Sequence, residues 1–431
     1  MRTVASNTGT IINPKGFGSV GYIKITIFGF ALSALWNSLH SIILQVRLLD
    51  FVAESQVNTY FGIITGSGLI LAMVVQPIAG AISDRSNFSW GRRRPYVLLG
   101  TIFAILFLPG IGFFSSYVAI FTIICLLQIS SNTAQGPYQA FIPDFVPEGK
   151  RGVASGVKGL LEIVGGVALL RLIAAFMDRY SAGEEGYWLW LALGVLAIVL
   201  LGAMLATIVT VKEQPGAGGY RVPLLPALYR SFKIDVKASP YFIQFLVSRL
   251  LILMAFAVMQ RFAYYFLKYF VGIANPAAVT ADLLIVVGVC MLISVYPAGR
   301  LSDRIGRRPV VVSSGLLGAL AILLLFFSHS YGYIMLCGGL LGISGGAFMS
   351  TNWALATDLI PKGEEARYLG LTNLATAGGA ALGLFTIGPM IDFFNGYSPG
   401  LGYQVMLIAC FIYFVVGSAL LMKVRARAYP R

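Results

Sequence analysis

The chain has 431 residues, of which 58% are hydrophobic and only 11% are charged, and its mean hydropathy is +0.82. A soluble domain carries about 25% charged residues, so this composition excludes a water-soluble protein and indicates a polytopic membrane protein. The net charge of +14 would point to a nucleic-acid partner in a soluble chain. Membrane proteins instead place excess Lys and Arg in cytoplasmic loops, so we expect a lipid bilayer around the chain and no nucleic acid.

Twelve stretches are long and apolar enough to span a membrane, since a spanning helix needs about 20 mostly apolar residues. In chain order they are 22–48, 58–82, 95–115, 117–142, 153–176, 188–211, 240–269, 279–299, 309–328, 332–357, 367–392 and 402–423. The longest polar connection follows the sixth span. The predicted organisation is therefore a six-helix bundle over 1–211, a cytoplasmic linker over 212–239 and a second six-helix bundle over 240–431.

The basic residues orient the predicted spans. Placing the N-terminus in the cytoplasm puts 23 of the 31 Lys and Arg residues on that side. The loops on the other side then carry mainly acids, such as Asp50, Glu54 and Asp178. Because positive residues favour the cytoplasmic side, we expect both termini in the cytoplasm of a multi-pass protein of the plasma or inner membrane.

The cysteines and the N-terminus add no further site. Cys125, Cys290, Cys337 and Cys410 all lie inside apolar stretches, without the spacing of metal ligands, so we expect neither disulfides nor a metal. The N-terminus lacks a short apolar core with a cleavage site, so no removable signal peptide is expected. With no nucleotide-binding loop and only two histidines, the sequence does not indicate an enzyme, and we expect no cofactor.

Two motifs recur along the chain. SDRSNFSWGRRRP begins at Ser83 and SDRIGRRP at Ser302, 219 residues later; DFVPEGKR begins at Asp144 and DLIPKGEEAR at Asp358, 214 residues later. The first pair falls in the loops after spans two and eight, and the second pair follows spans four and ten. Two motifs at nearly one offset indicate an internal duplication of six spans.

These motifs resemble those of a known family. GRLSDRIGRRP, from Gly299 to Pro309, is similar to the G-x-x-S-D-R-x-G-R-R-P signature of the major facilitator superfamily. The longer first copy, preceded by Gln76 and Pro77, resembles sucrose transporters and the related glycoside–pentoside–hexuronide symporters. QGPYQAFIPD, which ends at Asp144, resembles the sucrose-transporter pattern Q-G-P-x-R-A-x-x-x-D with glutamine at the arginine position. The resemblance implies an all-α membrane fold of twelve transmembrane helices in two pseudo-symmetric six-helix bundles.

Two features depart from these relatives. RFAYYFLKYF, from Arg261 to Phe270, stands where plant sucrose transporters carry an Asp-Thr-Asp-Trp-type cluster, which puts sucrose itself in doubt. No carboxylate lies between Thr59 and Ser83, whereas sodium-coupled melibiose-type relatives carry acids there. The second departure favours the proton as coupling ion over sodium.

The repeated motifs are candidates for gates. The resemblance to the superfamily implies a gating role for the S-D-R motif. In that role it holds the cytoplasmic faces of the two halves together in one state and releases them in another. A carboxylate there pairs with arginine or lies at a helix N-terminus; the alternative is a topology marker with a solvated ion pair. The predicted gate residues are Asp84, Arg85, Arg92, Arg151, Asp303, Arg304, Arg307, Asp358 and Arg367.

A stripe of amides marks a candidate cavity. Spans one, four, seven and ten resemble the cavity-lining helices of the superfamily, and on span four Gln128, Asn132, Gln135 and Gln139 lie within roughly 60° of one another at helical spacing. Amides facing lipid would be unsatisfied, although membrane Asn and Gln also join helices. Together with imidazole and aromatic rings, they suit a neutral, hydroxyl-rich small molecule. The predicted ligands are Asn37, His40, Gln128, Asn132, Gln135, Gln139, Gln260, Tyr264, Asn352 and Trp353.

Two carboxylates are candidates for proton coupling. Asp144 matches the aspartate that the sucrose-transporter resemblance associates with coupling, but its repeat partner Asp358 makes a structural cap an equal alternative. Glu162 on span five is the second candidate, and Lys158 lies one turn away as a possible ion-pair partner. Ionisable residues deep in a membrane are functional candidates by default.

The predicted function is proton-coupled symport of a sugar or glycoside by alternating access, by a monomer. One alternative is a proton-coupled antiporter that exports a small organic molecule; the absence of proline on span five weakens it, because exporters of the superfamily carry a Gly-Pro-rich motif there. Another is a non-transporting assembly or pigment-delivery factor of the same fold. The amide stripe speaks against that role, which needs no hydrated cavity.

Overall fold

The computed structural model describes residues 19–213, 240–327, 330–359 and 365–423, and these residues form helices without strands. The twelve predicted spans are confirmed by helices long and apolar enough to cross a bilayer. They are Val20–Leu48, Glu54–Ser83, Arg94–Phe113, Tyr117–Phe145, Arg151–Ser181, Tyr187–Thr210, Pro240–Val271, Pro276–Ile305, Arg307–Leu325, Tyr331–Leu359, Leu371–Asn395 and Leu401–Met422. Most of the predicted linker lies outside the described residues.

The N-terminal six spans contain several helix breaks. Their elements are α1 (Ser19–Ser38), η1 (Leu39–Ile43), α2 (Leu44–Leu48), η2 (Glu54–Gln56), α3 (Val57–Ser83), α4 (Arg94–Phe107), α5 (Gly110–Phe113), α6 (Tyr117–Gln139), α7 (Phe141–Phe145), η3 (Glu148–Lys150), α8 (Arg151–Ala168), α9 (Leu170–Ser181) and α10 (Tyr187–Thr210).

The C-terminal six spans are more continuous. Their elements are α12 (Pro240–Tyr265), η4 (Phe266–Val271), α13 (Pro276–Ile305), α14 (Arg307–Leu325), α15 (Tyr331–Leu359), α16 (Glu365–Asn395) and α17 (Leu401–Lys423). Both η1 and η4 are π-helical and lie in the first span of their half. Such local π turns occur frequently at functional sites.

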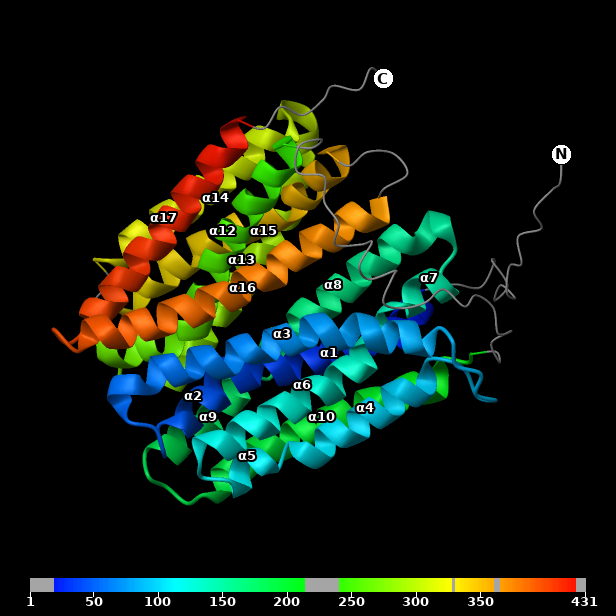
Figure 1. The fold of residues 1–431 in the computed structure, drawn as a ribbon, viewed down its shortest axis with the longest axis horizontal. Helices are drawn as coiled ribbons and strands as arrows, with labels where there is room; N and C mark the ends of the chain where they lie inside the picture. Colours follow the sequence, from blue (N-terminus) through cyan, green and yellow to red (C-terminus); the bar gives the residue numbers. More distant parts are fainter. Residues whose placement is uncertain (1–18, 214–239, 328–329, 360–364, 424–431) are drawn as a thin grey trace.

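The spans pack as two six-helix bundles. In the N-terminal half α6 contacts α3 and α4, and α1 contacts α8 and α10; in the C-terminal half α15 contacts α13 and α14, and α12 contacts α16 and α17. The halves meet chiefly where α3 lies beside α16 (Figure 1). They also meet where α9 contacts α13. These two contacts are equivalent under the six-span repeat, since spans two and eleven correspond to spans eight and five.

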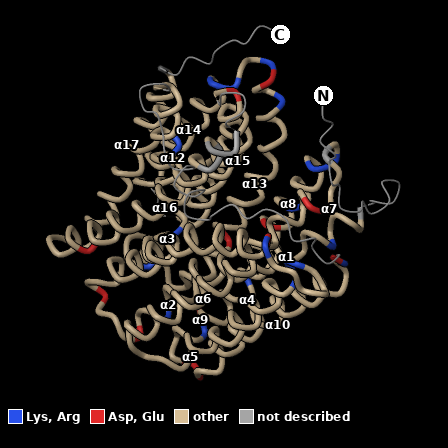
Figure 2. The backbone as a smooth tube through the Cα atoms, turned by 45° about the vertical axis from the view of Figure 1, so that its right-hand side comes forward, with Lys and Arg blue, Asp and Glu red and all other residues tan. Residues whose placement is uncertain are grey.

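The surface of the bundles is apolar, as lipid requires. Side chains such as Ile198, Val118 and Ile293 are each about 70% exposed, whereas a soluble monomer rarely exposes large contiguous apolar patches. Charged residues gather near the helix ends, with long uncharged stretches between them (Figure 2). The protein is therefore a multi-pass protein of the cell membrane.

The helices of the two bundles end on two opposite sides of the molecule. We call the side that carries 83–94, 143–151 and 302–308 the SDR end. We call the other side, with the loops 49–53, 114–116, 182–186, 272–275 and 396–400, the far end.

One expectation about the SDR end is wrong. The second S-D-R copy lies in the last turn of α13 rather than in a loop, and the helix ends at Gly306, whose φ of 97° suits glycine.

Glycines bring the halves into close contact toward the far end. A Cβ atom on Gly62 of α3 would lie 2.4 Å from the carbonyl oxygen of Leu384 on α16, and one on Gly388 would lie 2.5 Å from the carbonyl oxygen of Asn58. No side chain fits at either position. Small residues thus let the two backbones approach, as is usual in membrane helix interfaces.

Candidate functional site

A cavity of about 820 Å³ lies between the two halves. Its lining comes from spans one, two, four and five of the first half and from spans seven and eleven of the second. It reaches from His40 and Arg261 in the interior to Gly80 and Gln139, which precede Ser83 and Asp144 by three and five residues. The cavity therefore extends toward the SDR end. We call it the central cavity.

The amide stripe of α6 faces this cavity. Gln128, Asn132, Gln135 and Gln139 all belong to its lining. The deeper two are linked, because Asn132 donates from Nδ2 to Gln128 Oε1 at 2.9 Å. The amides of Gln135 and Gln139 form no hydrogen bond with a described residue, which leaves them free to bind a solute.

The other predicted ligands are divided among three environments. His40 lines the central cavity. Asn37 and Gln260 hydrogen-bond to each other across the halves at 3.0 Å and line a second, mostly apolar cavity of about 510 Å³. Tyr264, Asn352 and Trp353 line neither cavity. Span ten thus contributes nothing to the central cavity in this state, and span eleven, through Asn373 and Thr376, lines it instead.

Two unpaired groups lie at the inner end of the central cavity. Arg261 lines it, its Nη1 is buried without a hydrogen-bond partner, and its guanidinium makes no ion pair with a described residue. His40 is 2% exposed, and neither of its ring nitrogens has a partner. The imidazole stacks on Trp36 with ring centroids 4.8 Å apart. Buried polar groups are usually paired, so these two require an explanation.

A second guanidinium lies just behind the lining. Arg249 is 3% exposed, donates from Nε to Thr376 Oγ1 at 3.1 Å and donates from Nη1 to Asn352 Oδ1. Its guanidinium carbon is 5.9 Å from the centroid of the Trp353 ring. Asn352 and Trp353 therefore hold Arg249, and Arg249 in turn contacts Thr376 in the cavity wall.

Glu162 forms an ion pair between the two cavities. Its carboxylate is 3.4 Å from Lys158 Nζ, one helical turn away on α8, which confirms the pairing expected from sequence. Glu162 lines the apolar cavity and Lys158 lines the central one. Among the described residues that line either cavity, Glu162 is the one carboxylate.

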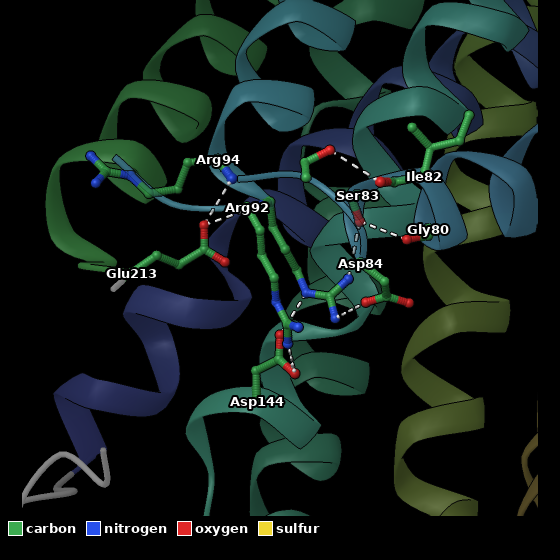
Figure 3. Close-up of polar contacts among 10 residues, drawn as sticks. Gly80, Ile82, Ser83, Asp84, Arg92, Arg94, Asp144 and Glu213 are labelled. Atoms are coloured by element: carbon green, nitrogen blue, oxygen red, sulfur yellow. Dashed lines mark hydrogen bonds and ion pairs between the residues drawn. The ribbon is translucent and has the colours of Figure 1, made fainter. Parts of the chain in front are cut away.

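Asp144, the other coupling candidate, belongs to an ion-pair cluster at the SDR end. It accepts from Arg92 Nη2 at 2.9 Å and from Arg93 Nε at 2.5 Å, and Arg93 also contacts Asp84 at 2.6 Å. Figure 3 shows Asp144 pointing at the arginine side chains from α7. Glu213 accepts from the backbone nitrogens of Arg93 and Arg94. The cluster joins spans two, three and four of one half.

Arg93 is the centre of this cluster, and its side chain is only 5% exposed. Burial disfavours a charged guanidinium, yet the hydrogen bonds and charges of Asp144 and Asp84 raise the pKa of Arg93 above its ordinary value. The sequence prediction named Arg92 and omitted Arg93. Alignment on the closing prolines of the two motifs could have found it, because that alignment pairs Arg93 with Arg307.

The second half repeats the arrangement. Arg307 contacts Asp358 at 2.7 Å and donates to the carbonyl oxygen of Ala354. Asp358 follows Asp144 by 214 residues and Arg307 follows Arg93 by 214 residues, so the two ion pairs are repeat equivalents. At the SDR end, each ion pair between described residues joins two residues of the same half.

The remaining predicted gate residues have varied surroundings. Arg151, on α8, donates to the carbonyl oxygens of Val146 and Pro143. Arg85 lies just after α3, and Asp303 and Arg304 are exposed in the last turn of α13. Arg367 lies on α16, but its side chain falls outside the described residues. A gating role for all of these residues stays a prediction.

Polar contacts between the halves concentrate toward the far end. Asp392 on α16 accepts from Asn58 Nδ2 at 2.8 Å and from the backbone nitrogen of Thr59 at 2.6 Å. Asp178 on α9 accepts from the backbone nitrogens of Ala277 and Ala278 at 3.2 and 2.9 Å. Each carboxylate thus meets the first turn of a helix in the other half, where unpaired N–H groups and the helix dipole favour a negative charge.

These two contacts, which we call the far-end latches, are related by the internal repeat. Asp392 follows Asp178 by 214 residues, and Ala277 follows Asn58 by 219, the same offsets as the two repeated motifs. Further links between the halves join Glu54 to Tyr269 at 3.0 Å and Arg171 to Asp282 at 3.3 Å. Polar contacts thus join the halves at the far end, while the central cavity extends toward the SDR end.

Comparison with known proteins agrees with this architecture. The structure resembles the D-xylose-proton symporter, with a TM-score of 0.72 at 16% identity over 94% of this chain and 98% of that one. It resembles the nucleoside transporter NupG with a TM-score of 0.69 at 14% identity over 94% of this chain and 99% of that one. These likenesses show the fold.

Sequence relatives are sugar transporters by name. The chain is 28% identical to the sucrose transport protein SUT1 of Oryza sativa subsp. japonica over 196 residues, which is 36% of this chain and 35% of SUT1. It is 22% identical to the lactose permease of Lactobacillus helveticus over 406 residues, 88% of this chain and 60% of the permease. The matches thus span about a third and three fifths of these relatives. A profile of the MFS/sugar transport protein family matches residues 27–423, and the chain therefore belongs to that family of membrane transporters.

Proposed function

We propose that this protein is a secondary transporter of a sugar or glycoside that works by alternating access. The observation that carries the proposal is the asymmetry of the interface between the halves. Far-end contacts join the halves, whereas each SDR-end ion pair between described residues stays within one half. A central cavity lined from both halves and extending to one end is the arrangement of one state of an alternating-access cycle.

The lining supports a hydroxylated solute. Amides both donate and accept hydrogen bonds, and an aromatic side chain such as Trp36 offers a flat apolar surface for a sugar ring. A volume of about 820 Å³ falls within the range of small-molecule sites, roughly 300–1,000 Å³. The relatives named as sucrose and lactose carriers support the same class.

We propose protons as the coupling ion and Glu162 as the group that carries them. Glu162 borders a cavity and pairs with a lysine that borders the other, so a change in its charge alters the central cavity through Lys158. Asp144, in contrast, is engaged by two arginines of the SDR cluster. We assign Asp144 to the gate. By the positive-inside rule, the SDR end faces the cytoplasm.

Counterflow uptake tests the transport proposal. Purified protein is reconstituted into vesicles loaded with one unlabelled glycoside, and entry of the same labelled glycoside is followed for a panel of mono- and disaccharides. We expect transient accumulation for at least one member. No counterflow with any glycoside, from vesicles shown to contain folded protein, would remove the sugar class.

A further inference from the structure

The central cavity has an unbalanced positive charge. Its charged lining residues are Lys158 and Arg261, and no carboxylate is among the described residues that line it. Lys158 is balanced by Glu162 at 3.4 Å. Arg261 has no such partner, although its Nη1 is buried and an unpaired buried charge is unfavourable. A neutral sugar would leave this charge uncompensated.

A second guanidinium adds to the positive field, and a histidine adds polar groups without adding charge. The guanidinium of Arg249, behind Thr376, contacts a hydroxyl, an amide oxygen and the face of an indole ring. These are neutral groups, so its charge also lacks an ionic partner among the described residues. His40, 98% buried beside the cavity, offers two ring nitrogens without partners. A cleft lined by one sign of charge concentrates ligands of the opposite sign.

We infer that the solute carried in the central cavity is an anion, specifically a hydroxylated organic acid whose carboxylate binds Arg261. This inference rests on the proposed transport function and revises the neutral ligand expected from sequence. A guanidinium matches a carboxylate through two parallel N–H···O bonds, and His40 supplies a further polar contact. The amides of Gln135 and Gln139, which have no described partner, bind the hydroxyls toward the SDR end.

The test uses probe pairs that differ in one group. Gluconate and sorbitol share a hydroxylated six-carbon chain but end in a carboxylate or a hydroxymethyl group, and lactobionate and lactitol repeat the comparison in a disaccharide. Binding to the purified full-length protein in nanodiscs is measured by quenching of Trp fluorescence, since Trp36 lines the cavity, and by isothermal titration. We expect each acid to bind at least tenfold more tightly than its polyol.

Single-residue variants test whether Arg261 produces the preference for acids over polyols. Arg261→Gln should reduce the ratio of acid affinity to polyol affinity at least tenfold. Arg261→Lys keeps the positive charge but lacks the two parallel N–H donors of a guanidinium, so it should retain part of the preference. Lys24→Gln is the matched control: it removes an exposed positive charge on α1 that lines neither cavity, and the ratio should stay above tenfold. A ratio is insensitive to a uniform loss of folded protein, so it separates recognition from stability.

The outcomes separate this inference from the proposed function. If the wild-type protein binds and exchanges the polyols or neutral glycosides as well as the acids, the anionic solute is wrong and the sugar transporter stands. If no acid, polyol or glycoside binds to folded protein, both proposals fail. If Arg261→Gln folds and keeps the preference for acids, the assignment of the carboxylate to Arg261 is overturned.

Discussion

Arg93 shows how much a single buried cation organises at the SDR end. Its guanidinium reaches Asp84, Asp144 and the hydroxyl of Ser83, and so connects α3, α4 and α7. Arg92, beside it in sequence, contacts Asp144 alone, and its side chain is 34% exposed. The two neighbours therefore differ in the number of partners and in solvent screening.

We predict that Arg93→Gln lowers the free energy of unfolding by about 1–3 kcal/mol, because hydrogen bonds to charged groups contribute roughly that much. Arg92→Gln should cost about 0–1 kcal/mol, as expected for a screened ion pair. Thermal unfolding of the two purified variants in the same detergent measures the difference. Equal losses would show that the cluster is not centred on Arg93.

A second prediction concerns proton coupling. Glu162→Gln should abolish accumulation driven by a pH gradient while labelled-for-unlabelled exchange continues, because exchange requires no net proton release. Asp144→Asn should instead slow gradient-driven uptake and exchange together, since both need the gate to close. Uptake by reconstituted vesicles with and without a pH gradient separates the two patterns. Normal accumulation by the Glu162 variant would move coupling elsewhere.

At the scale of elements, α6 carries different chemistry on different faces. The face with Gln128, Gln135 and Gln139 lines the central cavity, whereas Ile129 is 40% exposed outside both cavities. The mean polarity of the helix says little about this division. Only the angular positions of the amides indicate that one face meets water and the other lipid.

We predict graded access along that face. In a background lacking the four native cysteines, Gln139→Cys should react fastest with a membrane-impermeant thiol reagent applied from the SDR end, Gln135→Cys more slowly and Gln128→Cys slowest. Ile129→Cys is the control and should stay unreactive, because a thiol in lipid does not ionise. Mass spectrometry of the labelled protein gives the rates. Equal rates at all four positions would contradict an aqueous cavity lined by this face.

At the scale of the whole molecule, two repeat-related interfaces hold the halves together. The α3–α16 and α9–α13 contacts each include a carboxylate at the first turn of a helix from the other half. The duplication makes the two far-end latches equivalent. In the proposed alternating-access cycle, opening the far end would break both latches in one step.

We predict that fixing one far-end latch stops transport. A Cys pair replacing Asn58 and Asp392, joined by a short reducible cross-linker, should block counterflow, and reduction should restore it. A Cys pair replacing Ser86 and Tyr96, whose hydroxyls lie 2.6 Å apart within one half, controls for the reagent and should transport at the same rate before and after cross-linking. Undiminished transport with the far-end latch cross-linked would exclude this opening.

Much of the architecture followed from short-range features of the sequence. The number of spans depends on local hydropathy, because each helix in lipid forms its own backbone hydrogen bonds. All twelve predicted spans are confirmed. The repeat offsets of 219 and 214 residues also apply, unforeseen, to the far-end latches. The stripe of α6 was predictable because helical periodicity alone places Gln128 and Gln139 on one face.

The tertiary structure decided which charges are paired and which are free. Proximity in sequence predicts the ion pair of Lys158 with Glu162, which lies one helical turn away. Proximity does not predict whether Asp144 contacts Arg93 or whether Arg261 contacts an acid. Those distances depend on packing between helices that are far apart in the chain. Likewise, span ten was expected in the cavity wall and span eleven was found there. Hydropathy and periodicity determine the helices and their polar faces, whereas the packing of one half against the other determines which faces meet and therefore what charge the solute encounters.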